Sequence, residues 1–257
     1  MDRGSLAHDL NVARSLLTTL MRAGLGTAAR PAAQQPDRPL EIYEFEGCPY
    51  CRIVREALTE LNLDAAIHPC PKRGTRFRPR VMALGGKMQF PFFVDPNTGA
   101  AMYESAAIVR YLFETYGRRP LPLHWRWIEL QQVGSGVAGI PRLGAGVRAA
   151  ASRPPDEPLE LYSFEANPSA RMVRERLCEL ELPYVLRSAG PSSGADWLPP
   201  ALLDALNRKH EPQTENRRTL LARAGRIAIP YLLDPNTGTE IGESAPILAY
   251  LDRTYAL

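Results

Sequence analysis

An internal repeat constrains the architecture of this chain more than any other feature of its sequence. Residues 40–46 (LEIYEFE) reappear 119 positions later as residues 159–165 (LELYSFE), and the Val-Arg-Glu triplet that starts at Val54 reappears at Val173. Self-similarity at a constant spacing indicates that one supersecondary unit occurs twice. The sequence therefore predicts two copies of one fold.

A second repeated block shows where the copies differ in length. Residues 90–99 (FPFFVDPNTG) match residues 229–238 (IPYLLDPNTG) at an offset of 139, so the second copy holds about twenty additional residues within 185–225. The 257 residues have room for two domains of about 100 residues, each with its own core. The predicted parts are an N-terminal helical segment at 1–38, a first domain at 39–119, a helical, glycine-rich linker at 120–157 and a second domain at 158–257.

Each copy begins with the pattern of a strand followed by a helix. Residues 40–45 alternate apolar and polar side chains, and residues 50–61 place apolar side chains on one helical face. Strands at 92–94 and 101–103 then flank the turn at 95–99, where proline presets φ and Asn and Gly accept left-handed conformations. The unit is therefore predicted to be α/β.

A closing helix is expected to complete each unit. Ser105 is predicted as its N-cap, with the helix running through Tyr116 and stopping at Gly117.

The composition narrows the range of functions. An apolar fraction of 45% and a charged fraction of 23% are those of an ordinary globular protein. A net charge of +3 is too small to indicate a nucleic-acid partner. Arg14 and Arg22 interrupt the N-terminal apolar pattern, so no membrane span is predicted and a cytoplasmic location is expected. The Arg-bearing, amphipathic N-terminal segment is interpreted as a docking helix, with organelle targeting or a membrane-surface helix as the alternatives.

The chemistry is expected at a Cys-Pro-Tyr-Cys motif formed by Cys48 to Cys51. It follows a strand and opens a helix, so the Cys48 sulfur should lie over unpaired amides at the positive end of the helix dipole. This setting stabilises a thiolate, the attacking species in disulfide exchange, and Cys51 is placed one turn later to resolve a mixed disulfide. We predict that Cys48 and Cys51 are catalytic.

No metal is predicted. A Cys-x-x-Cys pair can also supply two of the four ligands of a zinc site, but the chain has no second such pair and no histidine pair with ligand spacing. Four cysteines are too few for a disulfide scaffold in a chain of this length, which favours a reducing compartment. Cys178 is interpreted as a core residue and Cys70 as a partly buried structural cysteine, with a third redox thiol or a glutathionylation site as the alternatives for Cys70.

Pro91 is the second candidate functional element. An X-Pro bond that heads an internal strand is a candidate for the cis isomer, which would turn backbone donors and acceptors toward a ligand. An edge-strand proline without a role would be the simpler interpretation, but Pro230 repeats the same context.

Cys48-Pro-Tyr-Cys51, Phe90-Pro91 and Glu104-Ser105, in this order, resemble a glutaredoxin or the N-terminal domain of a glutathione S-transferase. The whole chain, including the segments 69–72 and 85–87 and the paired Asp-Pro-Asn-Thr-Gly turns, is similar to the tandem proteins of bacteria and plastids that carry two such domains. The resemblance implies two thioredoxin-like domains, each a mixed four-stranded sheet flanked by helices.

The resemblance also implies a glutathione site in the first copy. Its residues would be Pro49, Tyr50, Phe90, Pro91, Glu104 and Ser105. Helix N-terminal donors at Ser105 suit an α-carboxylate, and Glu104 can pair with an α-amino group. Ser105 could equally serve only as a helix cap.

Two charged positions bear on the thiol. Glu46 occupies the region where glutaredoxins usually carry a lysine, and it would oppose a Cys48 thiolate. Arg52 or Arg55 could compensate, or both could be solvated helix residues.

The second copy has lost both sulfurs, because Asn167-Pro-Ser-Ala170 replaces the cysteine motif. It keeps Ile229, Pro230, Glu243 and Ser244, which could form a second, non-catalytic site. A purely structural partner domain is the alternative.

These observations together predict a glutathione-linked thiol-disulfide oxidoreductase. Glutathione would be the co-substrate, and disulfides or glutathionylated proteins would be the partners. The alternatives are conjugation of glutathione to an electrophile, as in glutathione S-transferases, and a non-catalytic module that binds glutathione or an iron-sulfur cluster.

Overall fold

The computed structural model of the protein describes residues 3–197 and 211–257. Each repeat has the predicted α/β pattern. The first half contains α1 (Arg3–Met21), β1 (Leu40–Glu44), α2 (Pro49–Leu61), β2 (Ala65–Pro69), α3 (Arg78–Gly85), β3 (Phe92–Asp95), β4 (Ala100–Tyr103), α4 (Ser105–Leu112) and the π-helical turn η1 (Phe113–Gly117).

The linker and the second half repeat this order. They contain the short 3-10 segments η2 (Leu123–Trp127), η3 (Ile140–Arg142) and η4 (Gly194–Trp197), the helices α5 (Ile128–Gly139), α6 (Pro168–Glu179), α8 (Glu215–Ala224) and α9 (Ser244–Tyr255), and the strands β5 (Leu159–Ser163), β6 (Tyr184–Ser188), β7 (Tyr231–Asp234) and β8 (Thr239–Gly242). The extra residues of the second copy lie between β6 and α8, and some fall outside the described residues.

The two predicted four-stranded sheets join into one sheet of eight strands in the order β4-β3-β1-β2-β6-β5-β7-β8. Within each half, one parallel pair (β1 with β2, β5 with β6) is combined with antiparallel neighbours, as a mixed sheet requires. The junction is an antiparallel pair of β2 and β6, in which Ala65 faces Leu186 and Ile67 faces Tyr184. Pairing β2 with β6 removes an exposed edge from each half.

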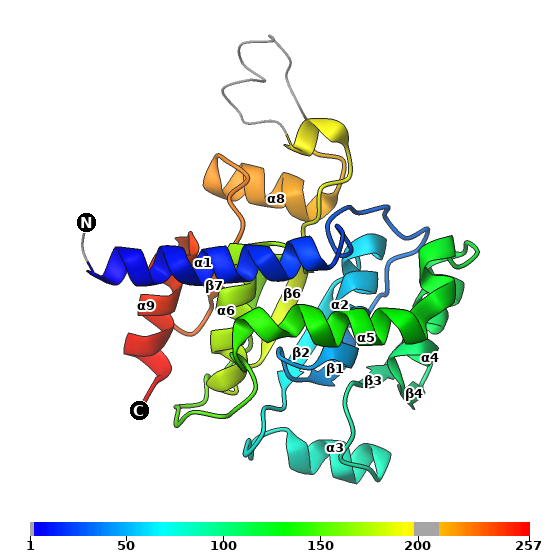
Figure 1. Ribbon diagram of the computed structural model, residues 1–257, viewed down its shortest axis with the longest axis horizontal. Helices are drawn as coiled ribbons and strands as arrows, with labels where there is room; N and C mark the ends of the chain where they lie inside the picture. The colour runs from blue at the N-terminus through cyan, green and yellow to red at the C-terminus, as the bar shows by residue number, and fades with distance from the viewer. Residues whose placement is uncertain (1–2, 198–210) are drawn as a thin grey trace.

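The helices that precede the two halves are exchanged between them. Helix α1 packs on α6 of the second half, and α5 packs on α2 of the first half (Figure 1). The same hydrogen bond fixes each contact: Ser15 Oγ donates to the Pro168 carbonyl and Ser135 Oγ to the Pro49 carbonyl, both at 2.8 Å. A pseudo-two-fold axis therefore relates the two halves, and the same rotation relates α1 to α5.

One apolar core extends through both halves. Ile42 and Leu58 from the first half and Leu161 and Leu177 from the second are fully buried members of the same cluster. Each such side chain contributes about 1.5–3 kcal/mol by its removal from water. The shared core holds the sheet and the N-termini of α2 and α6 in fixed positions.

Candidate active site

The Cys-Pro-Tyr-Cys motif lies where β1 ends and α2 begins. Cys48 is the N-cap of α2 in an extended conformation, and Pro49 occupies the first helical turn, where its missing N–H costs nothing. The Cys51 backbone N–H donates to Cys48 Sγ at 3.4 Å. As predicted, the Cys48 sulfur faces the N-terminal amides of a helix.

The two thiols of the motif have opposite acidities. A hydrogen bond from the Cys51 thiol lowers the pKa of Cys48 despite burial, and backbone N–H donors of Cys51 and Tyr50 add to this effect. Burial raises the pKa of Cys51 well above its ordinary value, and its bond to Cys48 raises it further. Cys48 is therefore the more nucleophilic partner, and Cys51 holds its proton until a mixed disulfide forms.

The motif is largely enclosed. Cys48 is 3% exposed and Cys51 is fully buried, whereas Tyr50 is 47% exposed and forms the accessible edge. Both cysteines are free thiols in this structure. A sulfur with so little exposure is less accessible to a rigid surface loop than to a slender reactant.

The other predicted site residues lie at the same end of the sheet. Tyr43 of β1 pairs with Phe92 of β3, and Phe92 pairs with Tyr103 of β4, so the residues flanking these pairs come together. Phe90 and Pro91 precede β3, and their peptide bond is cis, as predicted. The rings of Phe90 and Phe45, which follows β1, meet edge to face with centroids 6.0 Å apart.

The N-terminus of α4 differs from the prediction. Glu104, not Ser105, is the N-cap, and no side chain caps this helix. Glu104 has a φ of 70°, a left-handed conformation that is unusual for a residue with a side chain and is typical of functional sites. Its Oε1 accepts a hydrogen bond from Gln89 Nε2 at 2.5 Å. Ser105 is 1% exposed in the first turn, where backbone N–H groups lack helical partners.

Sequence analysis missed the contribution of α5. Gln132 Nε2 donates to Ser105 Oγ at 3.4 Å, and Ser135 Oγ donates to Pro49 O, so the linker helix contacts both ends of the predicted glutathione site. A signal was present, because Arg22-Ala-Gly-Leu-Gly26 resembles Arg142-Leu-Gly-Ala-Gly146, which marks equivalent segments after the two helices.

Sequence analysis also missed Glu44, the last residue of β1. It is 2% exposed, and burial raises its pKa to about 7 even though Arg55 Nη1 lies 2.6 Å from its Oε2. Its charge raises the pKa of both Cys48 and Cys51. A carboxyl group that titrates near neutral pH therefore lies within electrostatic reach of the two thiols.

Of the two interpretations of Arg52 and Arg55, compensation of Glu46 is present and solvation is wrong. Arg55 Nη2 lies 3.3 Å from Glu46 Oε2. Arg52 and Arg55 are buried and not solvated, and Arg55 Nε contacts Glu165 Oε2 of the second half at 2.8 Å. Glu46 is neutralised in turn by Arg174 of the second half, at 3.0 Å. Its charge is therefore compensated across the junction, and Glu44 is the carboxylate that acts on the Cys48 thiol.

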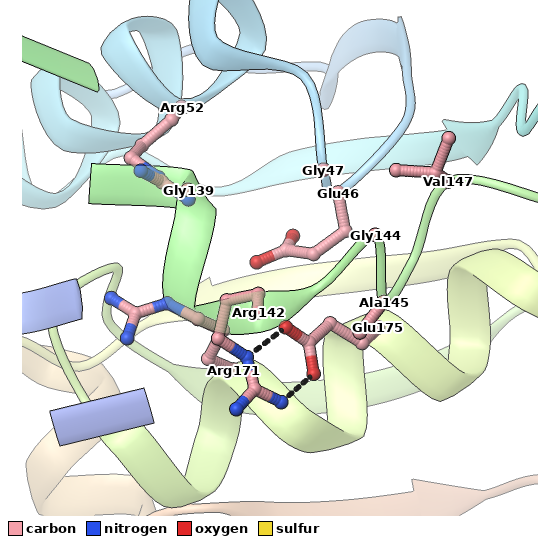
Figure 2. A pocket seen from close by; sticks show the side chains of 10 residues that line it. All are labelled: Glu46, Gly47, Arg52, Gly139, Arg142, Gly144, Ala145, Val147, Arg171 and Glu175. Carbon is pink, nitrogen blue, oxygen red and sulfur yellow. Dashed lines mark hydrogen bonds and ion pairs between the residues drawn. The ribbon is translucent and has the colours of Figure 1, made fainter. Parts of the chain in front are cut away.

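A small cavity lies beside this charge network (Figure 2). Its volume is about 30 Å³, far below the several hundred Å³ of a small-molecule site, so it does not hold glutathione. Arg142 pairs with Glu175 across it through two hydrogen bonds. The lining residues are Glu46, Gly47, Arg52, Gly139, Arg142, Gly144, Ala145, Val147, Arg171 and Glu175.

In the second half, Asn167 occupies the position of Cys48, and both ends of its side-chain amide make hydrogen bonds. Asn167 caps α6 by accepting from the Ala170 N–H at 2.8 Å, and its Nδ2 donates to the Ile229 carbonyl at 3.4 Å. The Ile229-Pro230 bond is cis, and Glu243 has the same φ of 70° as Glu104. Ser244 is buried, with its Oγ 3.3 Å from His8 Nε2 of α1. The backbone of the site is thus kept without the thiols.

The other two cysteines lie in buried surroundings that are typical of structural residues. Cys70 and Cys178 are buried, and burial raises the pKa of each thiol. Within residues 3–197 and 211–257, no group of histidine, cysteine and carboxylate side chains is arranged to hold a metal ion. None of the helices in this part of the chain is long and apolar enough to cross a membrane.

Comparison with known proteins identifies the family of the chain. A sequence profile described as glutathione S-transferase, N-terminal domain, matches the chain twice, at residues 42–120 and 161–257. The chain therefore belongs to the glutathione S-transferase N-terminal domain family. No curated protein matched it in a sequence search.

Two solved structures show partial similarity. A Bombyx mori glutathione transferase is 24% identical over 34% of this chain and 39% of its own, with a TM-score of 0.28. A delta-class glutathione transferase from Nilaparvata lugens is 28% identical over 32% of this chain and 38% of its own, with a TM-score of 0.27. The match spans about two fifths of each transferase.

Proposed function

We propose that this protein is a glutathione-linked thiol-disulfide oxidoreductase. The observation that carries the proposal is the pair of thiols at the start of α2, in which the pKa of Cys48 is lowered and that of Cys51 is raised. The cis Phe90-Pro91 bond and the Glu104-Ser105 helix start support glutathione binding by residues 39–119. Residues 158–257 then form a supporting domain, and the small number of cysteines favours a reducing compartment such as the cytoplasm.

The proposed reaction has two steps. The Cys48 thiolate attacks the glutathionyl sulfur of a mixed disulfide, the partner's thiolate leaves, and Cys48 becomes bonded to glutathione. Cys51 then loses its proton and attacks Cys48 Sγ, which releases a glutathione thiolate and leaves a Cys48–Cys51 disulfide. Alternatively, a second glutathione thiolate attacks the bound glutathionyl sulfur, restores the Cys48 thiolate and departs as glutathione disulfide.

The test is titration of the reduced protein with glutathione disulfide, followed by mass spectrometry of Cys48. We expect a glutathionyl adduct or a Cys48–Cys51 bond, and at least about a 1,000-fold loss of disulfide reduction in Cys48→Ser. Cys51→Ser is the matched control, because it should accumulate the Cys48 adduct and keep the glutathione-resolved route. An unmodified Cys48 in the wild-type protein would overturn the proposal.

Conjugation of glutathione to an electrophile is the second candidate, and membership of the transferase N-terminal domain family favours it. Conjugation of a chloronitrobenzene substrate that persists in Cys48→Ser would support this function. If Cys48→Ser loses both disulfide reduction and conjugation, Cys48 serves both reactions.

A further inference from the structure

Helices α1 and α5 are built with their polar sides inward. Ser15 and Thr18 of α1 and Ser135 of α5 are fully buried against the protein. The bonds of Ser15 and Ser135 to backbone carbonyls satisfy these inward hydroxyls. The inward side of α1 is therefore the reverse of an ordinary surface helix, which buries its apolar side. Helix α5 also buries Ile128 and Ala138, so its inward side is mixed.

The outward sides of the two helices are apolar. We call this surface the outer helix face, and it consists of Leu6, Leu10, Leu17 and Leu20 of α1, Leu130, Val133 and Val137 of α5, and the adjoining Ile140. Each of these side chains is between 47% and 72% exposed. The two helices lie side by side across the same side of the sheet, so their outward sides form one surface (Figure 1).

The face is too large to be an ordinary feature of a monomer. Eight aliphatic side chains, each about half exposed or more, present on the order of 800 Å² of apolar surface, whereas the largest patch of a typical monomer is about 300–600 Å². The same area is about what one partner contributes to a stable protein–protein interface.

The face repeats itself about the pseudo-two-fold axis. Leu10, Leu17 and Leu20 are followed 120 residues later by Leu130, Val137 and Ile140. A two-fold contact between identical chains brings the same patch of both copies together, so the apolar rows of one copy would meet the apolar rows of the other.

The charges near the face select the partner. The exposed charged residues on the described parts of the two helices are Asp9 and Arg14 of α1 and Glu129 of α5. A surface that binds anionic lipid needs an excess of lysine and arginine, which these three residues do not provide. Because the three residues carry both signs, Arg14 of one copy can instead pair with Asp9 or Glu129 of the other.

From this arrangement we infer that the outer helix face is a self-association surface on which a second copy of the chain docks. The partner copy would then rest on α5, the helix whose inner side contacts Pro49 and Ser105 at the thiol site. Dimerisation would thereby restrain the helix that contacts Pro49, the residue next to Cys48.

The test is sedimentation velocity of the full-length reduced protein across a concentration series. We expect a species of twice the 28.5 kDa chain mass at micromolar concentration. Leu17→Glu combined with Val137→Glu should raise the dissociation constant at least about 100-fold, since two-fold symmetry places four carboxylates in the apolar contact. A wild-type protein that is monomeric at every concentration would overturn the inference.

Two controls keep the test specific. Leu84→Glu changes a residue of α3 that is 53% exposed and lies outside the face, so it should leave the dimer intact. If the double variant does not fold by circular dichroism, the wild-type concentration series decides the question alone. Flotation with anionic phosphatidylglycerol vesicles tests the contrary outcome. A protein that stays monomeric and binds these vesicles would show that the face is a lipid-binding surface.

Discussion

The two halves of the molecule keep the same scaffold but differ in the residues that carry chemistry. Both have a cis-proline before an internal strand, a glutamate with a φ of 70° before the closing helix and a buried arginine on the first helix, Arg55 or Arg174. The second half replaces Cys48 by Asn167, Cys51 by Ala170 and Glu44 by Ser163.

This difference separates the structural residues from the chemical ones. Glu46 and Glu165, Arg55 and Arg174, and the outer pairs of Arg22 with Glu56 and Arg142 with Glu175 are present in both halves. Within this buried charge network, Glu44 alone is lost together with the sulfurs. The network therefore serves the junction of the halves, whereas Glu44 belongs with the thiols.

The largest expected effect on stability comes from breaking the network across the junction. Glu165→Gln should destabilise the protein at pH 7 by about 3–5 kcal/mol, because it removes one of the two carboxylates that Arg55 and Arg174 share and leaves uncompensated positive charge buried. Chemical denaturation measures this change. Glu240→Gln, which breaks a partly exposed pair with Arg223, should cost less than about 1 kcal/mol.

The pH dependence of Glu165→Gln has a definite sign. Burial alone would raise the pKa of Glu165, but Arg174 and Arg55 lower it to about 2, below its ordinary value of 4.5. The stability that this carboxylate contributes is therefore present above pH 4.5 and is lost as the pH falls toward 2. A difference between wild type and variant that does not shrink in this range would contradict the assignment.

Glu44→Gln, in the half that has the thiols, should change the pH dependence of stability by a smaller amount and in the opposite direction. Burial raises the pKa of Glu44 from 4.5 to about 7, so the folded protein retains a proton that the unfolded chain has released. The stability of wild type relative to the variant should fall by about 3 kcal/mol as pH rises from 4.5 to 8. Denaturation curves at several pH values measure it, with Glu41→Gln on the same strand as the control.

The same variant addresses the chemistry. Glu44 raises the pKa of both thiols, so Glu44→Gln should speed alkylation of Cys48 at neutral pH. Unchanged alkylation and parallel stability curves would show that Glu44 belongs to the junction, in the same way as Glu46.

The smallest effect is expected at the position that replaced the nucleophile. Asn167→Ala removes the side-chain cap of α6 and should cost about 1 kcal/mol in thermal or chemical denaturation. Asn167→Asp is the matched comparison, since it keeps a capping oxygen but removes the donor to Ile229 O. A cost for Asn167→Asp equal to that for Asn167→Ala would show that closure of the second site, and not capping, is what the side chain supplies.

The sequence by itself determined the repeated α/β unit, the position of Cys48 at a helix start and the two cis-prolines, because each depends on residues close together in the chain. Periodicity, helix-start preference and X-Pro chemistry are local properties. Even at this level one detail failed, since Glu104 and not Ser105 precedes α4 as its cap.

Only the tertiary structure decided how the copies are combined. Pairing β2 with β6, exchanging α1 and α5, and joining Arg55 to Glu165 all depend on residues at least 86 positions apart in the chain. A single sequence indicates that Arg55 and Glu46 are charged, but burial and partners depend on the packing of the other half. For this reason the sequence left open whether Arg55 is solvated or compensates Glu46, and the structure shows it buried and paired with Glu46. The apolar outward face of α1 and α5 likewise became visible only in the tertiary structure.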